Sequence, residues 1–146
     1  MPRKKRIALS GGFDPLHVAH LDMINDAAKY GNVIIILNSD DWLWNKKGWS
    51  LMNWDDRKKI LLNIRNVKDV VSVDDTDGTV CEALQRIKPH YFGNGGDRTK
   101  KNTPEMKICE ELGIEMVWKL GGPKARSSSQ LIHDVLYRIY PELDDR

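Results

Sequence analysis

The sequence has few cysteines, little net charge and no long apolar run, and each shortage excludes a class of protein. Its 146 residues include two cysteines, Cys81 and Cys109, and neither belongs to a C-x-x-C pair or has histidines at metal-ligand spacing. A disulfide scaffold and a cysteine-based zinc site are therefore excluded, and we expect buried, reduced thiols. The formal net charge of +2 provides no strong field for nucleic acid.

No run is apolar for long enough to span a bilayer, and the N-terminus has no apolar h-region of a signal peptide. We therefore expect a cytoplasmic protein with neither a membrane nor a nucleic-acid partner. The basic cluster at residues 3–6 could contact RNA or an acidic lipid, but a solvated basic tail over residues 1–5 is the preferred interpretation. Residues 141–146 are expected to be a polar tail, and the length predicts one domain over residues 1–146.

Apolar runs and helical patterns alternate along the chain, and continuous β-branched runs are typical of parallel strands buried on both faces. The expected strands lie near residues 7–9, 33–37, 70–73, 91–92 and 114–118. The expected helices cover about 17–29, 55–63, 80–87, 104–113 and 127–139. Residues 38–53 are expected to form a long loop. The alternation predicts an α/β fold with a Rossmann-like, doubly wound, five-stranded parallel sheet.

Four loops that follow strands hold most of the glycine-rich and polar segments, and they cover residues 10–17, 38–53, 93–102 and 120–127. In open parallel sheets the ligand lies beyond the carboxyl ends of the strands, where the strand order reverses. We therefore expect these four loops to meet at one edge of the sheet and to form a binding site there.

The segment from Gly11 to His20 reads Gly-Gly-Phe-Asp-Pro-Leu-His-Val-Ala-His and directly follows the first strand. Two glycines allow a tight turn and a close approach of the backbone to a ligand. His17 and His20 are three residues apart at the start of a helix, so both lie on one face beside an N-terminus that favours anions. The alternative is a helix-capping loop with two surface histidines, but the combination favours a phosphate cradle.

This segment resembles the signature G-x-F-D-x-x-H-x-G-H of the cytidylyltransferase-like nucleotidylyltransferase family, with Ala19 in place of a glycine. The resemblance extends over nearly the whole chain. Gly95-Gly96-Asp97 resembles the K-G-G-D of ADP-heptose synthases, and the Trp-Asn-Lys-Lys run at 44–47 resembles glycerol-3-phosphate cytidylyltransferases. Three serines at 127–129 stand where the family opens its last helix. The arginine that cytidylyltransferases carry shortly before this point is missing, and Lys124 is the nearest basic residue.

The resemblance implies a nucleotidylyltransferase that transfers a nucleoside monophosphate from ATP or CTP to a sugar or polyol phosphate and releases pyrophosphate. Magnesium would enter with the triphosphate, and the chain would supply no metal ligand. The implied catalytic residues are His17, His20 and Lys47. The implied nucleotide-binding residues are Gly11, Gly12, Phe13, Asp14, Gly96, Asp97, Ser127, Ser128 and Ser129. Asp40, Trp42 and Arg57 are assigned to the second substrate, and Arg65 to the interface of a homodimer.

Several of these residues also have simpler interpretations. Lys47 could be a solvated loop lysine, and Asp97 a turn residue. The serines could simply cap the last helix, which is compatible with binding phosphate as well. Asp14 is expected to fix its loop rather than to hold a metal. The tryptophans at 42, 44, 49 and 54 form either a substrate wall or lid, or a surface that packs against a partner subunit.

Adenylyl transfer from ATP is preferred because Gly95-Gly96-Asp97 is present and the upstream arginine is missing. Cytidylyl transfer from CTP to glycerol 3-phosphate or a similar alcohol phosphate is the alternative, favoured by the short length and by the run at 44–47. A regulatory module that binds nucleotide without catalysis is an alternative of another class, supported by Ala19 and by the altered residue before the serines. A tRNA-handling protein is disfavoured because the chain is too short for a synthetase.

Overall fold

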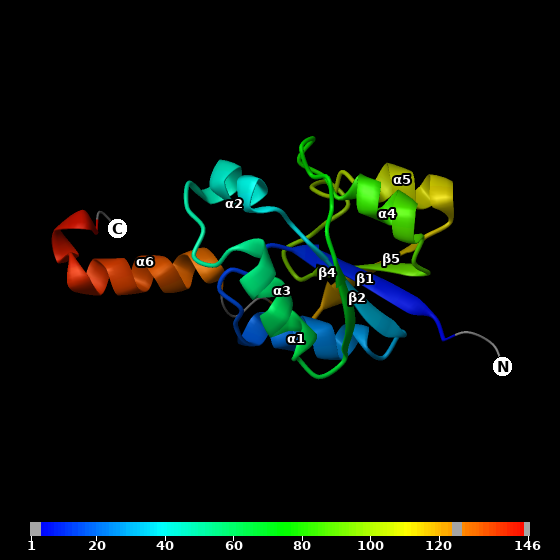
Figure 1. The fold of residues 1–146 in the computed structure, drawn as a ribbon, viewed down its shortest axis with the longest axis horizontal. Coiled ribbons are helices and arrows are strands. Elements are labelled where there is room, and N and C mark those ends of the chain that lie inside the picture. The colour runs from blue at the N-terminus through cyan, green and yellow to red at the C-terminus, as the bar shows by residue number, and fades with distance from the viewer. Residues whose placement is uncertain (1–3, 124–126, 145–146) are drawn as a thin grey trace.

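Five parallel strands form the centre of the computed structural model, which describes residues 4–123 and 127–144 (Figure 1). The strands are β1 (Arg6–Gly11), β2 (Asn32–Leu37), β3 (Val67–Val71), β4 (Tyr91–Gly95) and β5 (Glu115–Leu120). Their order is β3-β2-β1-β4-β5, and all four neighbouring pairs are parallel. The chain builds outward from β1 to β3, then returns to the other side of β1 for β4. The strand order therefore reverses between β1 and β4, where a ligand crevice is expected.

Alternate side chains of the buried strands point to opposite faces of the sheet, as the pleat requires. On β2, Ile35 and Leu37 belong to one core cluster, whereas Ile36 belongs to a second. On β1, Leu9 and Ala8 divide in the same way. All five side chains are fully buried, which explains why the run at 33–37 is apolar throughout rather than alternating.

Helices cover both faces of the sheet. α1 (Val18–Ala27) and α3 (Trp54–Leu62) contribute to the first core cluster, and α4 (Cys81–Ile87) and α5 (Met106–Leu112) contribute to the second. In Figure 1, α1 and α3 lie on one side of the strands while α4 and α5 lie on the other. The predicted doubly wound, five-stranded parallel α/β fold is confirmed.

The prediction that residues 38–53 form a loop was wrong for half of that segment, which contains helix α2 (Asp40–Lys47). The Ser39 hydroxyl caps the helix by accepting the backbone N–H of Trp42. Gly48 ends the helix at φ 79°. Acidic residues occupy the first turn and lysines the last, which suits the helix dipole. Leu43 is the one buried residue of α2, so the segment lacks the apolar periodicity that identifies a helix.

Helix α6 (Ser128–Ile139) is the last long element, and the short 3-10 turn η1 (Pro141–Leu143) follows it. Figure 1 shows α6 projecting away from the sheet, so that η1 lies at the far end of the molecule from the start of β1. Within residues 4–123 and 127–144, no helix combines the length and the apolar character that crossing a membrane requires. Lys124, residues 1–3 of the expected basic tail and residues 145–146 of the expected polar tail lie outside the described residues.

Candidate active site

A cavity of about 360 Å³ lies at the carboxyl ends of the central strands. Its wall includes the last residues of β1, β4 and β5 and the loops that follow them, together with one side of α2. The four loops that the sequence analysis expected to meet all contribute to this wall. The cavity also spans the point between β1 and β4 where the strand order reverses, as the topology requires.

The glycine turn after β1 brings α2 against the cavity. A Cβ at Gly12 would lie 2.6 Å from Cδ2 of Leu43, so a side chain there would push α2 away from the turn. Phe13 follows with a φ of 51° and is buried, which anchors the turn in the core. Gly11, Gly12 and Phe13 all line the cavity.

His17 and His20 together open helix α1. Nδ1 of His17 accepts the backbone N–H of Ala19 at 3.2 Å, and Nδ1 of His20 accepts the backbone N–H of His17 at 3.2 Å. The two side chains thus form a reciprocal capping box, a role that serine and glutamate usually fill. Their rings stack with centroids 3.9 Å apart, and Phe13 lies 4.7 Å from the His20 ring.

This capping fixes the protonation pattern of the neutral rings. A ring nitrogen that accepts a hydrogen bond carries no proton, so neutral His17 and His20 hold their protons on Nε2. Both rings line the cavity beside the N-terminus of α1. The arrangement places two oriented imidazole rings and a helix N-terminus at one place, and a helix N-terminus favours an anion.

The start of α6 forms another part of the cavity wall, where Ser127, Ser128 and Ser129 all contribute. Ser127 caps the helix by accepting the backbone N–H of Gln130 at 3.0 Å. Ser128 is buried and donates from Oγ to the carbonyl of Pro15 at 2.8 Å. Helix geometry leaves the first-turn amides without intrahelical acceptors, so this wall also offers N–H groups to an anion.

Helix α2 supplies a wall that is both aromatic and cationic. Trp42, Lys46 and Lys47 line the cavity. Nζ of Lys46 lies 4.6 Å from the centroid of the Trp42 ring, and Nζ of Lys47 lies 4.7 Å from that of Trp49. Nζ of Lys47 also donates to the carbonyl of Asp14 at 3.3 Å, which holds this lysine beside the glycine turn.

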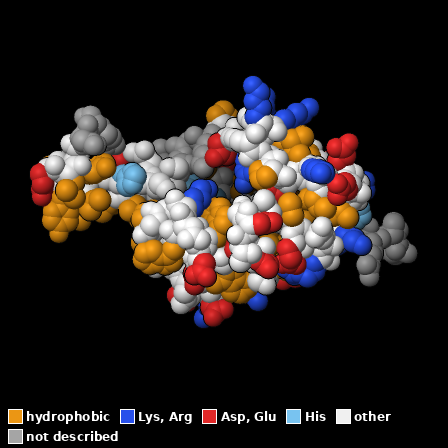
Figure 2. Space-filling view, turned by 90° about the horizontal axis from the view of Figure 1, so that it is seen from above, with side chains coloured by type: hydrophobic (Ala, Val, Ile, Leu, Met, Phe, Trp, Pro, Cys, Tyr) orange, Lys and Arg blue, Asp and Glu red, His pale blue; other side chains and the backbone are white. Residues whose placement is uncertain are grey.

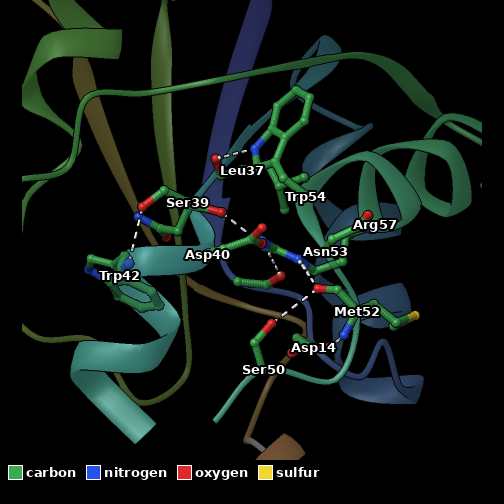
Figure 3. Close-up of polar contacts among 12 residues, drawn as sticks. Asp14, Leu37, Ser39, Asp40, Trp42, Ser50, Met52, Asn53, Trp54 and Arg57 are labelled. Atoms are coloured by element: carbon green, nitrogen blue, oxygen red, sulfur yellow. Dashed lines mark hydrogen bonds and ion pairs between the residues drawn. The ribbon is translucent and has the colours of Figure 1, made fainter. Parts of the chain in front are cut away.

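The other tryptophans of this region do not line the cavity. Trp54 packs against the first core cluster and donates from Nε1 to the carbonyl of Leu37 at 3.1 Å (Figure 3). Trp44 is more than half exposed. Of the four tryptophans at 42, 44, 49 and 54, the structure therefore brings Trp42 to the site.

Asp14 and Arg57 support the site from behind rather than entering it, as neither lines the cavity. The Asp14 carboxylate is fully buried and accepts the backbone N–H groups of Leu51 at 2.7 Å and Met52 at 3.1 Å (Figure 3). Arg57 is 1% exposed. Its guanidinium donates to the carbonyls of Gly12, Asn38 and Met52 at 2.8–3.0 Å.

Asp40 completes the Arg57 network. Its Oδ1 accepts from Nη2 of Arg57 at 2.6 Å, and it too lies outside the cavity wall (Figure 3). Asp40 and Arg57 were expected at the second substrate, but the structure does not bring them into the cavity. The guanidinium instead donates hydrogen bonds to three loop carbonyls and one carboxylate, so it holds the loops together.

The loop after β4 forms the remaining wall with Gly96, Asp97 and Arg98. Arg98 is held by an ion pair in which Nη1 lies 3.3 Å from Oε1 of the buried Glu105. Arg98 was not among the residues expected at the site, although it directly follows the Gly95-Gly96-Asp97 run. A cation held by a buried carboxylate adds positive charge to a cavity that already contains two lysines and two histidines.

Asn38 and Asp75 were not among the residues expected at the site either. Asn38 is buried and lines the cavity, and its amide donates to Oδ2 of Asp75 at 3.0 Å. The same carboxylate accepts the Ser39 backbone N–H at 2.8 Å and the Ser39 hydroxyl at 2.6 Å. Asp75 lies 36 residues from Ser39, so no local pattern in the sequence indicated that it positions the start of α2.

Asp26 holds Gly121, which lines the cavity and turns the chain after β5. Its carboxylate accepts the backbone N–H of Gly121 at 2.7 Å and pairs with Lys29 at 3.1 Å. These contacts, the Gly121 hydrogen bond first, hold the pKa of Asp26 below its usual value. The contact joins the last turn of α1 to the loop that leads to α6.

Arg65 and the two cysteines lie away from the cavity wall. Arg65 is exposed in the turn between α3 and β3, the strand at one edge of the sheet. Cys109 is fully buried in α5, and burial raises the pKa of its thiol to about 12. Among the described residues, no group of three or more His, Cys, Asp or Glu side chains is placed to hold a metal ion.

The sequence pattern of the cytidylyltransferase-like family matches residues 8–132. The chain therefore belongs to the cytidylyltransferase-like family. The match covers all four walls of the cavity.

The chain is similar to several curated proteins of this kind. It is 38% identical over 114 residues to bifunctional protein HldE of Aliarcobacter butzleri, covering 76% of the chain and 24% of that protein. It is 31% identical over 144 residues to HldE of Geobacter metallireducens, covering 95% of the chain and 28% of that protein. The chain thus spans about a quarter of the length of these relatives.

The chain is also similar to two further proteins. FAD synthase of Pyrococcus abyssi is 32% identical over 98 residues, which cover 66% of each protein. The crystal structure of the lipopolysaccharide core biosynthesis protein from Thermoplasma volcanium superposes with a TM-score of 0.70 at 20% identity, covering 80% of this chain and 97% of that chain. At this identity the superposition supports the fold alone.

Proposed function

We propose that this chain is an enzyme that transfers a nucleoside monophosphate from a nucleoside triphosphate to a phosphorylated small molecule. The observation that carries the proposal is the pair His17 and His20, capped into fixed orientations and facing one cavity with the serine-headed start of α6. Two N–H-bearing rings, two helix N-termini and three cations from α2 and the β4 loop surround one space of about 360 Å³. A triphosphate is the ligand that this set of donors suits.

The reaction is an in-line displacement at the α-phosphorus. An oxygen of the acceptor phosphate forms the new bond to the α-phosphorus, and the bond to the oxygen that bridges to the β-phosphate breaks, so pyrophosphate leaves with that electron pair. Such transfers depend mainly on positioning and on stabilising charge. In our proposal, His17, His20 and Lys47 meet the negative charge that develops on the α-phosphate and the leaving oxygen.

The remaining residues hold the triphosphate in place. The first-turn amides of α6 and the Ser129 hydroxyl bind the β- and γ-phosphates, and the backbone of Gly11, Gly12 and Phe13 lies against the α-phosphate. Gly96 and Asp97 contact the nucleoside. Magnesium would enter bound to the triphosphate, because this ion usually keeps its waters and takes few protein ligands. The ion supplies neutralisation of phosphate charge.

Asp14, Asp40 and Arg57 position these groups without touching the substrates. Arg57 reaches the Gly12 carbonyl and the start of α2 at once, so it sets the distance between the glycine turn and the α2 wall. In this proposal, Trp42 and Lys46 on that wall contact the acceptor.

Adenylyl transfer from ATP is the preferred form of the reaction. The Gly95-Gly96-Asp97 run supports it, and so do the HldE relatives and the FAD synthase, whose named product contains an adenylyl group. CTP-dependent transfer to an alcohol phosphate is the alternative, and it is favoured by the similarity of the run at 44–47 to glycerol-3-phosphate cytidylyltransferases. The chain is proposed to act in the cytoplasm as a homodimer.

A panel of triphosphates against acceptors tests the proposal. ATP and CTP are each mixed with a sugar 1-phosphate, glycerol 3-phosphate and a flavin mononucleotide, and pyrophosphate release is measured with magnesium present. We expect release with ATP and at least one acceptor. Tight binding of ATP without pyrophosphate release from any pair would instead support a regulatory module without catalysis.

A further inference from the structure

Two buried asparagines, Asn38 and Asn94, line the cavity on the two strands that flank β1. Asn38 directly follows β2 and is 2% exposed, and Asn94 lies in β4 and is 4% exposed. β1 lies between these two strands in the sheet. Buried amides are rarely left without hydrogen bonds, so the contacts of each amide show what it offers to a ligand. We call these two residues the amide pair.

The amide nitrogens of both residues are already used by the protein. Nδ2 of Asn94 donates to the carbonyls of Phe92 at 3.3 Å and Val117 at 3.2 Å. Nδ2 of Asn38 donates to the Asp75 carboxylate at 3.0 Å. Carbonyl and ionised carboxylate oxygens accept but do not donate, so each amide must turn its NH2 group towards them. The orientation of both side chains is thereby fixed, with Oδ1 on the other side of the amide group.

The two Oδ1 atoms are the part of the amide pair that a ligand can use. Within residues 4–123 and 127–144, no group donates a hydrogen bond to either oxygen, and neither oxygen is sealed off from solvent. Since both residues line the cavity, both oxygens are accessible from it. An amide oxygen accepts a hydrogen bond and cannot donate one. The amide pair therefore offers a ligand two acceptors.

Much of the remaining wall offers donors and positive charge. The first-turn amides of α1 and α6 suit anionic oxygens, and so do Lys46, Lys47 and Arg98. In the space-filling view, Lys and Arg side chains lie where the body of the molecule meets the projecting α6 (Figure 2). An amide oxygen instead repels an anionic oxygen, because neither carries a proton to share. The amide pair therefore disfavours a phosphate and favours a neutral group that donates a hydrogen bond.

The amide pair also points to a different face of the sheet from α1. Phe92, two residues before Asn94, belongs to the second core cluster, and so does Ile36, two residues before Asn38. Side chains two residues apart in a strand share a face, so Asn94 points towards the face that α4 and α5 cover, and Asn38 continues this pattern one residue past β2. The capped histidines belong to α1, which covers the other face. A triphosphate against the histidines and α6 would leave the amide pair to the acceptor.

We propose that the amide pair determines the specificity for the acceptor by binding neutral hydroxyl groups of that molecule through the two Oδ1 atoms. This inference rests on the proposed function. The hydroxyl-bearing carbons of the acceptor, and not its phosphate, then lie against Asn38 and Asn94, while the phosphate lies nearer the lysines of α2. The exocyclic amino group of an adenine or cytosine base is a donor of the same kind, so the test separates these two sources.

The test compares phosphates that have hydroxyl groups with analogues that lack them. Glycerol 3-phosphate is paired with propyl phosphate, and glucose 1-phosphate with cyclohexyl phosphate. Binding to the wild-type chain is measured by calorimetry with magnesium and α,β-methylene-ATP present, so that no transfer occurs. We expect the hydroxyl-bearing member of at least one pair to bind about tenfold more tightly or better, because its analogue leaves an amide oxygen unpaired.

The side-chain amide resonances of Asn38 and Asn94 give a residue-specific reading that needs no turnover. We expect them to shift in nitrogen–proton correlation spectra when the preferred hydroxyl-bearing phosphate is added, and not with α,β-methylene-ATP alone. Asn94→Ala should lose most of the preference for the hydroxyl-bearing member, whereas a merely structural defect would weaken both members equally. Asn63→Ala is the matched control, because it removes an exposed amide on α3 that bonds the Lys59 carbonyl, and it should keep the preference.

Equal binding within both pairs, including no detectable binding of any of the four phosphates at millimolar concentration, would overturn the inference. A shift of the Asn94 amide with the ATP analogue alone would also overturn it and assign the amide pair to the base. Hydroxyl-dependent binding without pyrophosphate release from ATP or CTP would contradict only the proposed function. Pyrophosphate release combined with equal binding within both pairs would contradict only the role of the amide pair.

Discussion

Nη1 of Arg57 donates to the carbonyl of Gly12 at 2.8 Å, so a buried guanidinium on α3 holds the glycine turn that follows β1. The same nitrogen donates to the carbonyl of Asn38 at 2.9 Å. One side chain thus links the two segments that carry the capped histidines and the α2 wall. Arg57 therefore helps to set the shape of the cavity although it does not line it.

Replacing this side chain should destabilise the fold strongly. In Arg57→Met, one buried and two partly buried carbonyl groups and one carboxylate lose their donor, and we expect a loss of about 3–5 kcal/mol in the free energy of unfolding, measured with urea. Asp40→Asn is the matched control, because it leaves the three carbonyl bonds in place and should cost about 1 kcal/mol or less. Equal losses in the two variants would mean that the ion pair, and not the loop carbonyls, carries the stabilisation.

The histidines have a structural and a chemical role that one substitution can separate. His17→Ala and His20→Ala should lower turnover by roughly 10² or more and also weaken the start of α1 by about 1 kcal/mol. His17→Asn keeps a good N-cap acceptor but removes Nε2, so it should retain the stability and still lose the activity. Pyrophosphate release and thermal unfolding measure the two effects. A fully active His17→Asn would mean that the ring serves only as a cap.

Lys47→Ala should act on the rate of transfer. Since Nζ of Lys47 is held beside the glycine turn by the Asp14 carbonyl, its removal should lower kcat by about 10² with a smaller effect on KM. Lys46→Ala is the comparison, because Lys46 lies over Trp42 on the same helix and is proposed to contact the acceptor. It should raise KM for the acceptor instead. An unchanged kcat in Lys47→Ala would identify Lys47 as a solvated lysine.

The Asp26 contact predicts a pH-dependent difference in stability. Because the pKa of folded Asp26 lies below the usual 3.8, the ionised carboxylate stabilises the fold above that pH, and this contribution disappears as the pH falls through the folded pKa. At pH 7 we expect Asp26→Asn to be less stable by about 1 kcal/mol, a modest value because the group is partly exposed. Urea unfolding should show the two proteins converging under strongly acidic conditions. A gap that widens on acidification would contradict the assignment.

The resemblance to the family assigns Arg65 to a dimer interface, and this remains a prediction. Arg65→Ala should weaken self-association, measured as the concentration dependence of the sedimentation coefficient. Arg65 lies in the turn before β3, the strand at one edge of the sheet. If Arg65→Ala sediments as the wild type does at every concentration, the assignment of Arg65 is wrong.

The fold and the location of the cavity could be predicted because their causes are local. Residues 33–37 are apolar throughout since the strand is covered on both faces, and the order of strands and helices then determines where the loops meet. Helix α2 was not predicted because it buries one side chain and is stabilised by capping instead. Its sequence therefore shows no apolar periodicity from which a helix could be predicted.

The supporting contacts could not be predicted because they join distant residues. Asp75 and Ser39 are 36 positions apart, and nothing near either residue indicates the other. Arg57 was expected at the substrate for a related reason. A sequence shows that an arginine is present, but only the tertiary structure shows that its donors are already used by backbone carbonyls.

No single stretch of the chain builds the cavity, whose lining begins at Ser10 and ends at Ser129. Any partial opening of the domain, whether a strand slips at one edge or the last helix detaches, takes away part of the lining. A bound ligand therefore opposes every such opening at once, and its binding free energy is added to the unfolding of the domain as a unit. Ligand binding and folding are then coupled in one equilibrium. The protein would therefore be more stable in cells that are rich in the ligand than in cells that lack it.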